Sequence, residues 1–446
     1  MAISWRLAAL LALGVLPVIV VPTVTGGAVS PTAMMLAWIS LVLALAALDL
    51  AVAGSPRAVR IERELPDRVR LGEPATATLL LTNHGSRSIR ALVRDGWEPS
   101  AGAQPSRHRL VVPAGERRAV TMTLTPFRRG ERRSHHVTVR SFGPLGIAAR
   151  QATLAEPAAI RVLPPFASRR HLPSRLARLR ELDGRTSIMI RGQGSEFDSL
   201  RDYVRGDDVR SIDWRATARR RDPATGTGQR VVVRTWRPER DRRIVIVIDS
   251  GRTSAARIDN ELRIDTAFES SLLLAALASR AGDRIDTVIY DRRVRARVQG
   301  TTGSELLARM VTAMAPVDPE LIEMDWTAVP ALVTSVTNRQ ALVVLMTSID
   351  SPGNSRALLG VLPQLTQRHR VLVCSVTDPT VKEASRERQD RDGVFRAAAA
   401  ERAMLDTARV SAAIRRLGGD VVTGTPQDLP PAVADRYLAL KAAGQL

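Results

Sequence analysis

Two long apolar runs at the start of the chain predict a pair of membrane-spanning helices. Residues 7–24 contain no charged side chain, and residues 29–48 are uncharged up to Asp49. Each run is long enough to cross a hydrocarbon core of about 30 Å. The connector Thr25-Gly26-Gly27-Ala28 has the composition of a tight turn. We therefore expect a transmembrane helical hairpin over residues 1–56.

The charges that flank the two runs predict an orientation. Arg6 precedes the first run, the connector is uncharged, and Arg57, Arg60 and Arg63 follow the second run. Because cytoplasmic flanks carry an excess of basic residues, we expect both ends and the soluble domains to be cytoplasmic. The alternative is a cleavable signal peptide followed by one anchor. The single arginine before the first run and the lack of a convincing small-residue cleavage site argue against it.

Residues 57–165 change to short segments of alternating polar and apolar residues, separated by Gly, Pro and Asn. Such segments are typical of antiparallel strands that bury one face. Their number and spacing predict a β-sandwich-like domain of immunoglobulin-like size. The predicted strands cover residues 75–81, 88–93, 109–112, 119–124, 136–139 and 159–163.

Residues 243–446 alternate β-branched apolar runs with helical patterns. The run Arg-Ile-Val-Ile-Val-Ile-Asp-Ser at 243–250 is typical of a parallel strand buried on both faces, and residues 259–280 show helical periodicity. Strand followed by helix, repeated, predicts a doubly wound α/β domain with helices on both faces of the sheet. The other predicted strands cover residues 285–290, 294–298, 341–346, 371–376 and 421–422.

The net charge of +20 on 446 residues raises the possibility of a nucleic-acid partner. Residues 57–165 carry 19 arginines against 9 acids and residues 166–243 carry 20 against 11, whereas the rest of the chain is nearly neutral. The excess therefore follows the predicted anchor, where an anionic membrane surface is the expected partner. A basic juxtamembrane nucleic-acid-binding protein is the alternative, disfavoured because aromatic residues for base stacking are scarce, at 3%.

The basic linking segment, residues 166–242, contains a dense pattern of acids, arginines and aromatics. Arginines and aspartates at such short spacing favour a network of salt bridges, with aromatic side chains packed beneath them. A hydrolase that uses Asp207, Asp208 or Asp213 as acid or base is a weaker alternative. The residues that we single out for interaction are Glu196, Phe197, Arg201, Tyr203, Gly206, Asp207, Asp208, Arg210, Asp213 and Trp214.

Three strings in this segment resemble the signature of a known protein family. The strings Gly194-Ser195-Glu196-Phe197, Leu200-Arg201-Asp202-Tyr203 and Gly206 to Trp214 resemble the signature of the bacterial domain-of-unknown-function 58 family. Residues 127–131 and 142–147 also look like the β-domain of that family. The resemblance implies a transmembrane pair, a β-domain and a von Willebrand factor A-like α/β domain.

A von Willebrand factor A-like domain implies a metal-ion-dependent adhesion site, in which Asp-x-Ser-x-Ser follows the first strand. Here Asp249, Gly251 and Thr253 occupy those positions. Thr301 or Thr302 is expected to supply a hydroxyl from another loop, and Asp350 the distal carboxylate. Such oxygen ligands suit Mg²⁺ or another divalent cation. The alternative is a degenerate site in which Asp249 only caps its loop.

The sequence lacks recognisable catalytic motifs, which favours a non-enzymatic protein. The six histidines do not accompany a nucleophile elbow, and a phosphate-binding loop with a terminal Lys-Ser/Thr is missing. The resemblance implies a protein partner, an ATPase of the MoxR type. We therefore expect a membrane-tethered protein-interaction or complex-assembly factor of the bacterial envelope.

Overall fold

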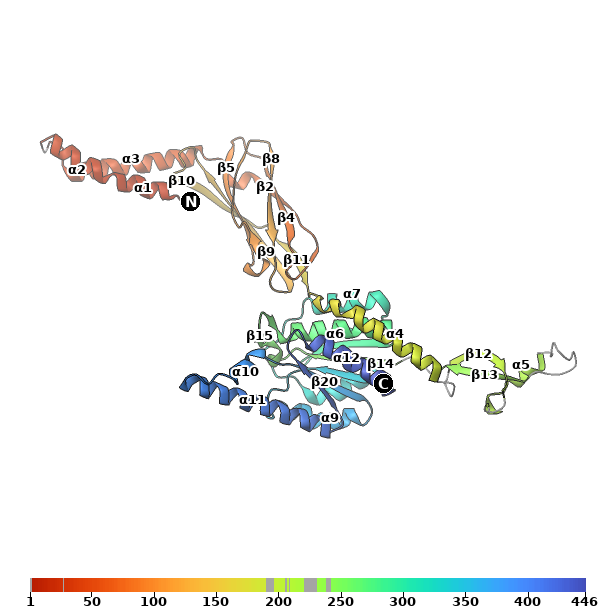
Figure 1. The fold of residues 1–446 in the computed structure, drawn as a ribbon. Helices are drawn as coiled ribbons and strands as arrows, with labels where there is room; N and C mark the ends of the chain where they lie inside the picture. Colours follow the sequence, from red (N-terminus) through yellow and green to blue (C-terminus); the bar gives the residue numbers. More distant parts are fainter. Residues whose placement is uncertain are drawn as a thin grey trace. The chain divides into compact units, whose positions relative to one another are not determined.

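The computed structural model describes residues 2–26, 28–189, 196–204, 207, 209–219, 231–237 and 242–446. The chain forms two compact units, Met1–Pro165 and Phe166–Leu446 (Figure 1). The predicted hairpin and β-domain together make the first unit. The linking segment and the α/β domain together make the second.

The first unit begins with two helical spans that are long and apolar enough to cross a membrane. The first span consists of α1 (Trp5–Leu13) and α2 (Val15–Val24), and the second is α3 (Pro31–Val52). The two spans approach each other at Gly14, where an added Cβ would lie 2.3 Å from the Trp38 ring. The Trp38 indole donates to the Leu10 carbonyl oxygen, 3.0 Å away. Because lipid offers no hydrogen bonds, such internal pairing stabilises a broken helix in a bilayer.

The rest of the first unit consists of two sheets that share one hydrophobic core. Alternate residues of the facing strands, such as Leu79, Leu81, Val137 and Val139, are fully buried in it. This is the sandwich that the alternating pattern predicts. One sheet contains β1 (Ala2–Ile3), β10 (Ala148–Leu154), β9 (Gly130–Phe142), β11 (Ala158–Leu163), β3 (Arg68–Arg70), β5 (Ile89–Trp97) and β7 (His108–Val112). The other contains β2 (Val59–Glu64), β4 (Ala75–Asn83), β8 (Arg117–Leu124) and β6 (Ala103–Gln104). The strands of both sheets pair antiparallel except for β3, which is parallel to β11.

The hairpin is joined to the sandwich by the loop between β9 and β10. The Asp49 carboxylate, fully buried near the end of α3, accepts hydrogen bonds from the backbone N–H groups of Leu145, Ile147 and Ala148 at 2.8–3.0 Å. Before α1, strand β1 pairs with the start of β10. Both ends of the hairpin are thus bonded to one loop, which we call the joint loop (residues 143–148).

Arg63 does not lie with the charges that flank the hairpin, although the sequence groups it with them. Its guanidinium is ion-paired with Asp95 at 2.8 Å inside the sandwich, where the two side chains are 5% and 1% exposed. The alternation of β2 explains this place, because Val59, Ile61 and Arg63 share the inward face of the strand.

The second unit is built on a six-stranded sheet with the order β18-β17-β14-β19-β20-β21. Five strands are parallel, and the edge strand β18 runs antiparallel to β17. Helices follow most strands, so the architecture is the predicted doubly wound one. The strands are β14 (Arg243–Asp249), β17 (Arg284–Tyr290), β18 (Val294–Val298), β19 (Leu342–Met346), β20 (Arg370–Val376) and β21 (Asp420–Gly424).

Two separate cores lie on the two faces of this sheet. Ile244, Ile246 and Ile248 of β14 point into one core, and Val245 and Val247 into the other, because successive side chains alternate. The first core is covered by α4 (Leu172–Met189), α6 (Arg263–Arg280), α7 (Gly303–Met314) and α12 (Leu429–Ala442). The second is covered by α8 (Val329–Val336), α9 (Arg356–Thr366) and α11 (Arg391–Arg416).

Part of the predicted linking segment belongs to the α/β core. Leu179 of α4 is 3% exposed and lies in the first core. Just before α4, the backbone N–H groups of Ala167 and Ser168 donate to the buried Glu269 carboxylate at 3.0 and 2.9 Å. The α/β unit therefore begins at Phe166 rather than at 243, because the apolar positions of α4 cover the sheet.

Candidate functional site

The candidate site lies at the carboxyl edge of the six-stranded sheet, where β14 ends in Asp249. This side chain is 3% exposed. One carboxylate oxygen accepts the Gly251 backbone N–H at 2.8 Å. The other accepts the hydroxyl groups of Thr347 at 2.7 Å and Thr253 at 3.4 Å. Asp249 and Thr253 therefore lie together as the sequence predicts, and Thr347 joins them from the neighbouring strand β19.

Burial raises the pKa of Asp249 above its ordinary value, and the hydrogen bonds from Thr347, Gly251 and Thr253 oppose that shift. The partners that it has are two hydroxyls and an amide, all neutral donors. A carboxylate that is buried among neutral partners is stabilised by a nearby positive charge. A cation is therefore expected to bind favourably at this edge of the sheet.

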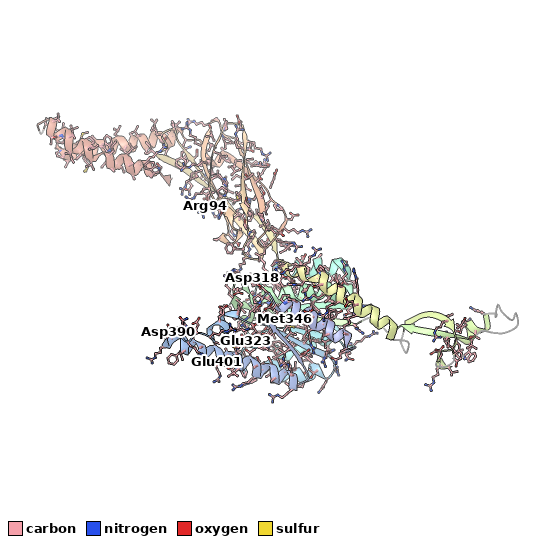
Figure 2. All side chains as sticks on the ribbon, viewed as in Figure 1. Arg94, Asp318, Glu323, Met346, Asp390 and Glu401 are labelled. Carbon is pink, nitrogen blue, oxygen red and sulfur yellow. The ribbon has the colours of Figure 1, made fainter. Side chains whose placement is uncertain are left out.

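Gly251 offers a backbone amide to this site and cannot be replaced by serine without movement. A Cβ at Gly251 would lie 2.9 Å from the Ile322 carbonyl oxygen and 3.0 Å from the Asp249 carboxylate. The segment 320–324 covers the position where the first hydroxyl of the adhesion-site pattern would stand, since Arg252 N–H donates to Ile322 O at 2.8 Å. Glu323, labelled in Figure 2, belongs to this covering segment.

Thr302 lies at the opposite edge of the sheet from Asp249, so the prediction that it completes the site is wrong. Strand β18 is antiparallel to β17, with Val298 opposite Thr287 and Val294 opposite Tyr290. The residues that follow Val298 therefore return toward the edge where β17 begins. Next to Thr302, the backbone N–H of Gly303 donates to the Ser279 hydroxyl at the end of α6. Thr301 is the neighbour of Thr302 just before α7, so it does not reach the site either.

Asp350 lies at the correct edge but is ion-paired with Arg263 at the start of α6. The Arg263 side chain, 15% exposed, lines a small hollow together with Ser254, Thr347 and Ser348. Its Nε is buried and lacks a hydrogen-bond partner among the described residues. The edge thus contains its own positive group, which neutralises the predicted distal ligand.

The donor set fits a hard cation only in part. Asp249, Thr253 and Thr347 carry the oxygen atoms that Mg²⁺ prefers, and a cation there would take its other ligands from water or a partner. Of the other predicted ligands, Gly251 has no side-chain oxygen, Thr302 lies at the opposite edge, and Asp350 is ion-paired with Arg263. Within the ranges that the structure describes, clusters of three or more His, Cys, Asp or Glu suited to a metal are not found.

A second candidate region is the hairpin of β12 (Glu196–Asp202) and β13 (Val232–Arg237), which carries the signature residues. The Arg201 guanidinium is bidentate on Asp207, at 2.6 and 2.8 Å. Asp213 accepts the N–H groups of Arg215 and Ala216 at the start of α5 (Trp214–Arg219), and Arg234 at 2.8 Å. Arg201 therefore pairs with Asp207 within the signature, and Asp213 pairs with Arg234 of β13, in agreement with a salt-bridge network.

These contacts disfavour acid or base chemistry by the signature aspartates. The Ala216 amide, then Arg234, lower the pKa of Asp213. A carboxylate held ionised in this way is a poor proton donor. Asp207 is held by Arg201, and Asp208 lies outside the described residues, as does Gly206.

The apolar signature residues are exposed. Trp214 is 66% exposed and Tyr203 37%, close in sequence to exposed Val204 and Val209. This differs from the expectation that the aromatic residues pack beneath the charges. Arg210 lies on the exposed turn Val209–Ser211. Glu196 and Phe197 belong to β12, but their side chains lie outside what the structure describes.

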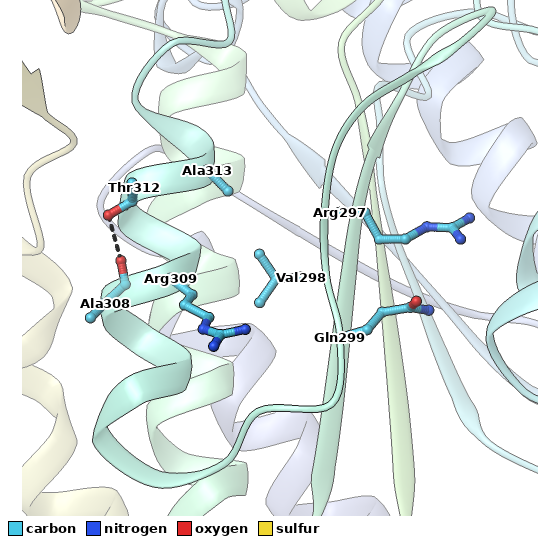
Figure 3. Close-up of a pocket in the computed structure, with 7 residues that line it drawn as sticks. All are labelled: Arg297, Val298, Gln299, Ala308, Arg309, Thr312 and Ala313. Atoms are coloured by element: carbon cyan, nitrogen blue, oxygen red, sulfur yellow. Dashed lines mark hydrogen bonds between the residues drawn. The ribbon is translucent and has the colours of Figure 1, made fainter.

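A shallow pocket between β18 and α7 is separate from both regions. Figure 3 shows Val298 facing α7, while Arg297 and Gln299 point away from the helix. Arg309 on α7 is already ion-paired with Glu305 at 2.7 Å. The pocket is lined by Arg297, Val298, Gln299, Ala308, Arg309, Thr312 and Ala313.

Helix α11 contacts the Asp350 loop at the carboxyl edge of the sheet. The Thr407 hydroxyl, midway along the helix, donates to the Asp350 carbonyl oxygen at 3.5 Å. The N-terminal half of α11 lies before this contact; it begins at the capping residue Asp390 and includes Glu401, both labelled in Figure 2. That half exposes large apolar side chains, namely Val394, Phe395, Met404 and Leu405.

The molecule is thus a multidomain protein with two apolar N-terminal helices and several β-sheets. Residues 199–414 match the model of a family described as "Protein of unknown function DUF58". This match covers the signature segment from Ser199 onward and most of the α/β unit.

The similarity to known sequences is distant. Uncharacterized proteins of Mycobacterium bovis and Mycobacterium tuberculosis are 27% identical over 242 residues, covering 50% of this chain and 72% of each relative. Among solved structures, the CARDB domain of a Pyrococcus furiosus protein aligns with 25% of this chain and 94% of its own, at 16% identity and a TM-score of 0.18. A β-glucosidase of Listeria innocua aligns with 23% of this chain and 16% of its own, at 18% identity and a TM-score of 0.14. Scores this low do not support an argument about the fold.

Proposed function

We propose that this protein is a membrane-tethered, non-enzymatic interaction factor of the bacterial envelope, with a von Willebrand factor A-like α/β unit. The observation that carries the proposal is the Asp249 loop at the carboxyl edge of the doubly wound sheet, the place where such sheets bind ligands. There the buried carboxylate accepts hydroxyl groups, and Arg263 lines a hollow with Thr347. The exposed apolar half of α11 extends from the neighbouring Asp350 loop, which Thr407 contacts. Apolar anchors beside a desolvated charge are the usual elements of a protein-binding surface.

The proposed partner is an ATPase of the MoxR type, which the family resemblance implies. A divalent cation at Asp249 stays a prediction. Held by Asp249, Thr253 and Thr347, it would offer positive charge to a carboxylate of the partner. Arg263 offers the same charge without a metal, so the two routes must be separated by experiment.

Co-purification from native membranes tests the proposal. The full-length protein should retain the ATPase, and Asp249→Asn should lose it. Thr347→Ala should lose it as well. Thr302→Ala is the matched control for Thr347→Ala and should retain the ATPase, because Thr302 lies at the opposite edge of the sheet. Equal retention of the ATPase by all these variants would overturn the proposal.

Chelation and charge removal then separate the two routes. Loss of the ATPase with EDTA, restored by Mg²⁺, would assign the contact to a cation at Asp249. Retention in EDTA with loss in Arg263→Gln would assign it to the guanidinium and remove the metal.

The proposed orientation places both ends of the hairpin and both units in the cytoplasm. Its basis is the arginine excess that flanks the spans. A C-terminal green fluorescent protein should fluoresce and a C-terminal alkaline phosphatase should be inactive. The opposite pair of results would reverse the orientation.

A further inference from the structure

Four arginines surround the place where the hairpin meets the sandwich. Each donates a guanidinium N–H to a main-chain carbonyl oxygen of that junction. Arg6 donates to Leu145 at 3.0 Å and Arg90 to Pro144 at 3.3 Å, both in the joint loop. Arg87 donates to Ala51 and Arg150 to Ala53, at the end of the second span. We call Arg6, Arg87, Arg90 and Arg150 the arginine collar.

The collar is exposed and pre-organised. All four residues are exposed to solvent, while one N–H of each is fixed on the backbone. A guanidinium carries five N–H donors in a planar fork, so each residue retains donors for another acceptor. Fixing the side chain beforehand lowers the entropy that a ligand would otherwise lose on binding.

Acidic residues do not balance this charge in the segments that form the junction. Residues 2–6, 51–58, 84–90 and 140–151 contain six arginines and neither aspartate nor glutamate. Asp49 is buried beneath three amides of the joint loop. The nearby turn after β7 carries Glu116, which is ion-paired with Arg118. The junction therefore presents a strongly positive surface.

The collar lies at the level where the spans leave the apolar region. Trp5 begins α1 directly beside Arg6 and is 77% exposed. Leu48 and Val52, near the end of α3, are 58% and 46% exposed. Tryptophan at the end of an exposed apolar helix is typical of the membrane interface, where the lipid headgroups lie.

We infer that the arginine collar binds the phosphate groups of anionic phospholipids. Arginine forks match phosphate oxygens, and basic residues this close to a bilayer concentrate anionic lipid. Positive charge alone would fix the orientation of the hairpin. The collar goes further, because arginines from two separate segments of the sandwich and from the start of α1 are all bonded to the same junction.

Native mass spectrometry of the full-length protein tests the inference. The protein is purified from mixed phosphatidylglycerol and phosphatidylcholine of matched acyl chains, and the retained lipids are counted. The wild type should retain phosphatidylglycerol preferentially. Replacing Arg6, Arg87, Arg90 and Arg150 by Gln should lower that retention by about fivefold or more.

The matched control removes four other exposed arginines, at the end of the sandwich away from the junction. Arg68→Gln, Arg70→Gln, Arg133→Gln and Arg161→Gln lower the net charge equally, and should leave the retention unchanged. Equal retention of both lipids by the wild type, or an equal loss in the control, would overturn the inference. So would displacement of the lipid by millimolar inorganic phosphate at constant ionic strength, since it would identify a free-anion site.

Folding of the collar variant is verified separately. Hydrogen exchange at the amides of Leu145, Ile147 and Ala148 reports whether the Asp49 contacts persist. If the fourfold variant does not fold, the double variants Arg6→Gln/Arg90→Gln and Arg87→Gln/Arg150→Gln replace it. Each should show part of the loss, and full retention in both would contradict the inference.

Discussion

The Arg263 guanidinium is ion-paired with the Asp350 carboxylate across the carboxyl edge of the six-stranded sheet. Arg263 opens helix α6, and Asp350 lies in the loop after β19. The ion pair engages the Asp350 carboxylate, which was the predicted distal metal ligand. It also holds a cationic group in the hollow beside Thr347. The edge of the sheet is therefore organised around Asp249 on one side and this ion pair on the other.

Replacing Asp350 by Asn should destabilise the α/β unit. Arg263 is only 15% exposed and would lose its charged partner, which we expect to cost about 1–3 kcal/mol. Hydrogen exchange of the β14 amides measures this free energy. Glu305→Gln is the control, because it removes the partner of Arg309 in a pair that is more than half exposed. Its expected cost is within about 0.5 kcal/mol, and equal costs would contradict the structural role of the Arg263 pair.

Asp249→Asn should stabilise the α/β unit at neutral pH while it removes partner binding. Burial raises the pKa of Asp249, so the folded protein holds its proton more tightly than the unfolded chain does. The free energy of unfolding is therefore highest below the unfolded pKa, about 4, and falls as pH rises through the folded pKa. Asparagine does not ionise, and we expect a gain of about 1 kcal/mol or more at pH 7.

The measurement is urea unfolding of wild type and variant across pH 4 to 8, followed by hydrogen exchange in β14. Burial raises the pKa of Asp283 and Glu261 as well, so the wild-type profile contains several groups with the same sign. The difference between the two profiles isolates Asp249. Parallel profiles would show that the raised pKa of Asp249 does not affect stability.

Asp95→Ala should severely destabilise the sandwich. The Asp95 carboxylate accepts Arg63, the Trp97 indole N–H and the Ser134 hydroxyl, the last two at 2.7 Å. Removing it leaves a buried guanidinium unpaired, at an expected cost of about 3–5 kcal/mol. Glu62→Ala breaks the exposed pair with Arg117 and should cost less than about 1 kcal/mol. Thermal unfolding of the full-length protein in detergent distinguishes them, and a mild Asp95 variant would count against the network.

Gly143→Ala should open the junction between hairpin and sandwich. A Cβ at Gly143 would lie 2.1 Å from the Asp49 carboxylate, so one of them must move, at an expected cost of about 1–3 kcal/mol. Amides 145, 147 and 148 should then exchange faster. Gly360→Ala is the control, since its Cβ would meet nothing within 4 Å. Unchanged protection in Gly143→Ala would show that the Asp49 contacts are not needed to hold the joint loop.

Trp214→Ala should weaken the proposed ATPase contact without a loss of stability. The side chain is 66% exposed, so truncation is expected to change stability by less than about 0.5 kcal/mol. Buried Trp326, 7% exposed, is the comparison, because its truncation should unfold the unit instead. Full ATPase retention by a folded Trp214 variant would show that the Trp214 region next to β12 and β13 does not take part in the interaction.

Alternating patterns predicted most of the strands, because each buried face has its own periodicity. Strands β2 and β10 were not predicted, since their sequences VRIERE and AARQATL carry few large apolar residues. The inward face of β2 even includes Arg63, which is tolerated there only because Asp95 neutralises it. Such compensation depends on a residue 32 positions away and cannot be detected in a local pattern.

The candidate site was predictable where one strand end determines it, as for Asp249 and Thr253. Thr302 was misplaced because periodicity does not reveal the direction of β18. The turn Asp291-Arg292-Arg293 could have revealed it, since a connection this short joins only antiparallel strands. Thr347 was overlooked in favour of Asp350, whose pairing with Arg263 depends on the packing of α6.

The pairing of β1 with β10 has a consequence for biogenesis. Ala2 and Ile3 precede the hairpin in the chain, but their partners Ala149 and Ala148 follow only after most of the sandwich has been translated. The hairpin is therefore synthesised while the Asp49 carboxylate is still without its three amides. A chain interrupted before Gly143 lacks these three amides, so only a chain that has passed the joint loop can cap the Asp49 carboxylate.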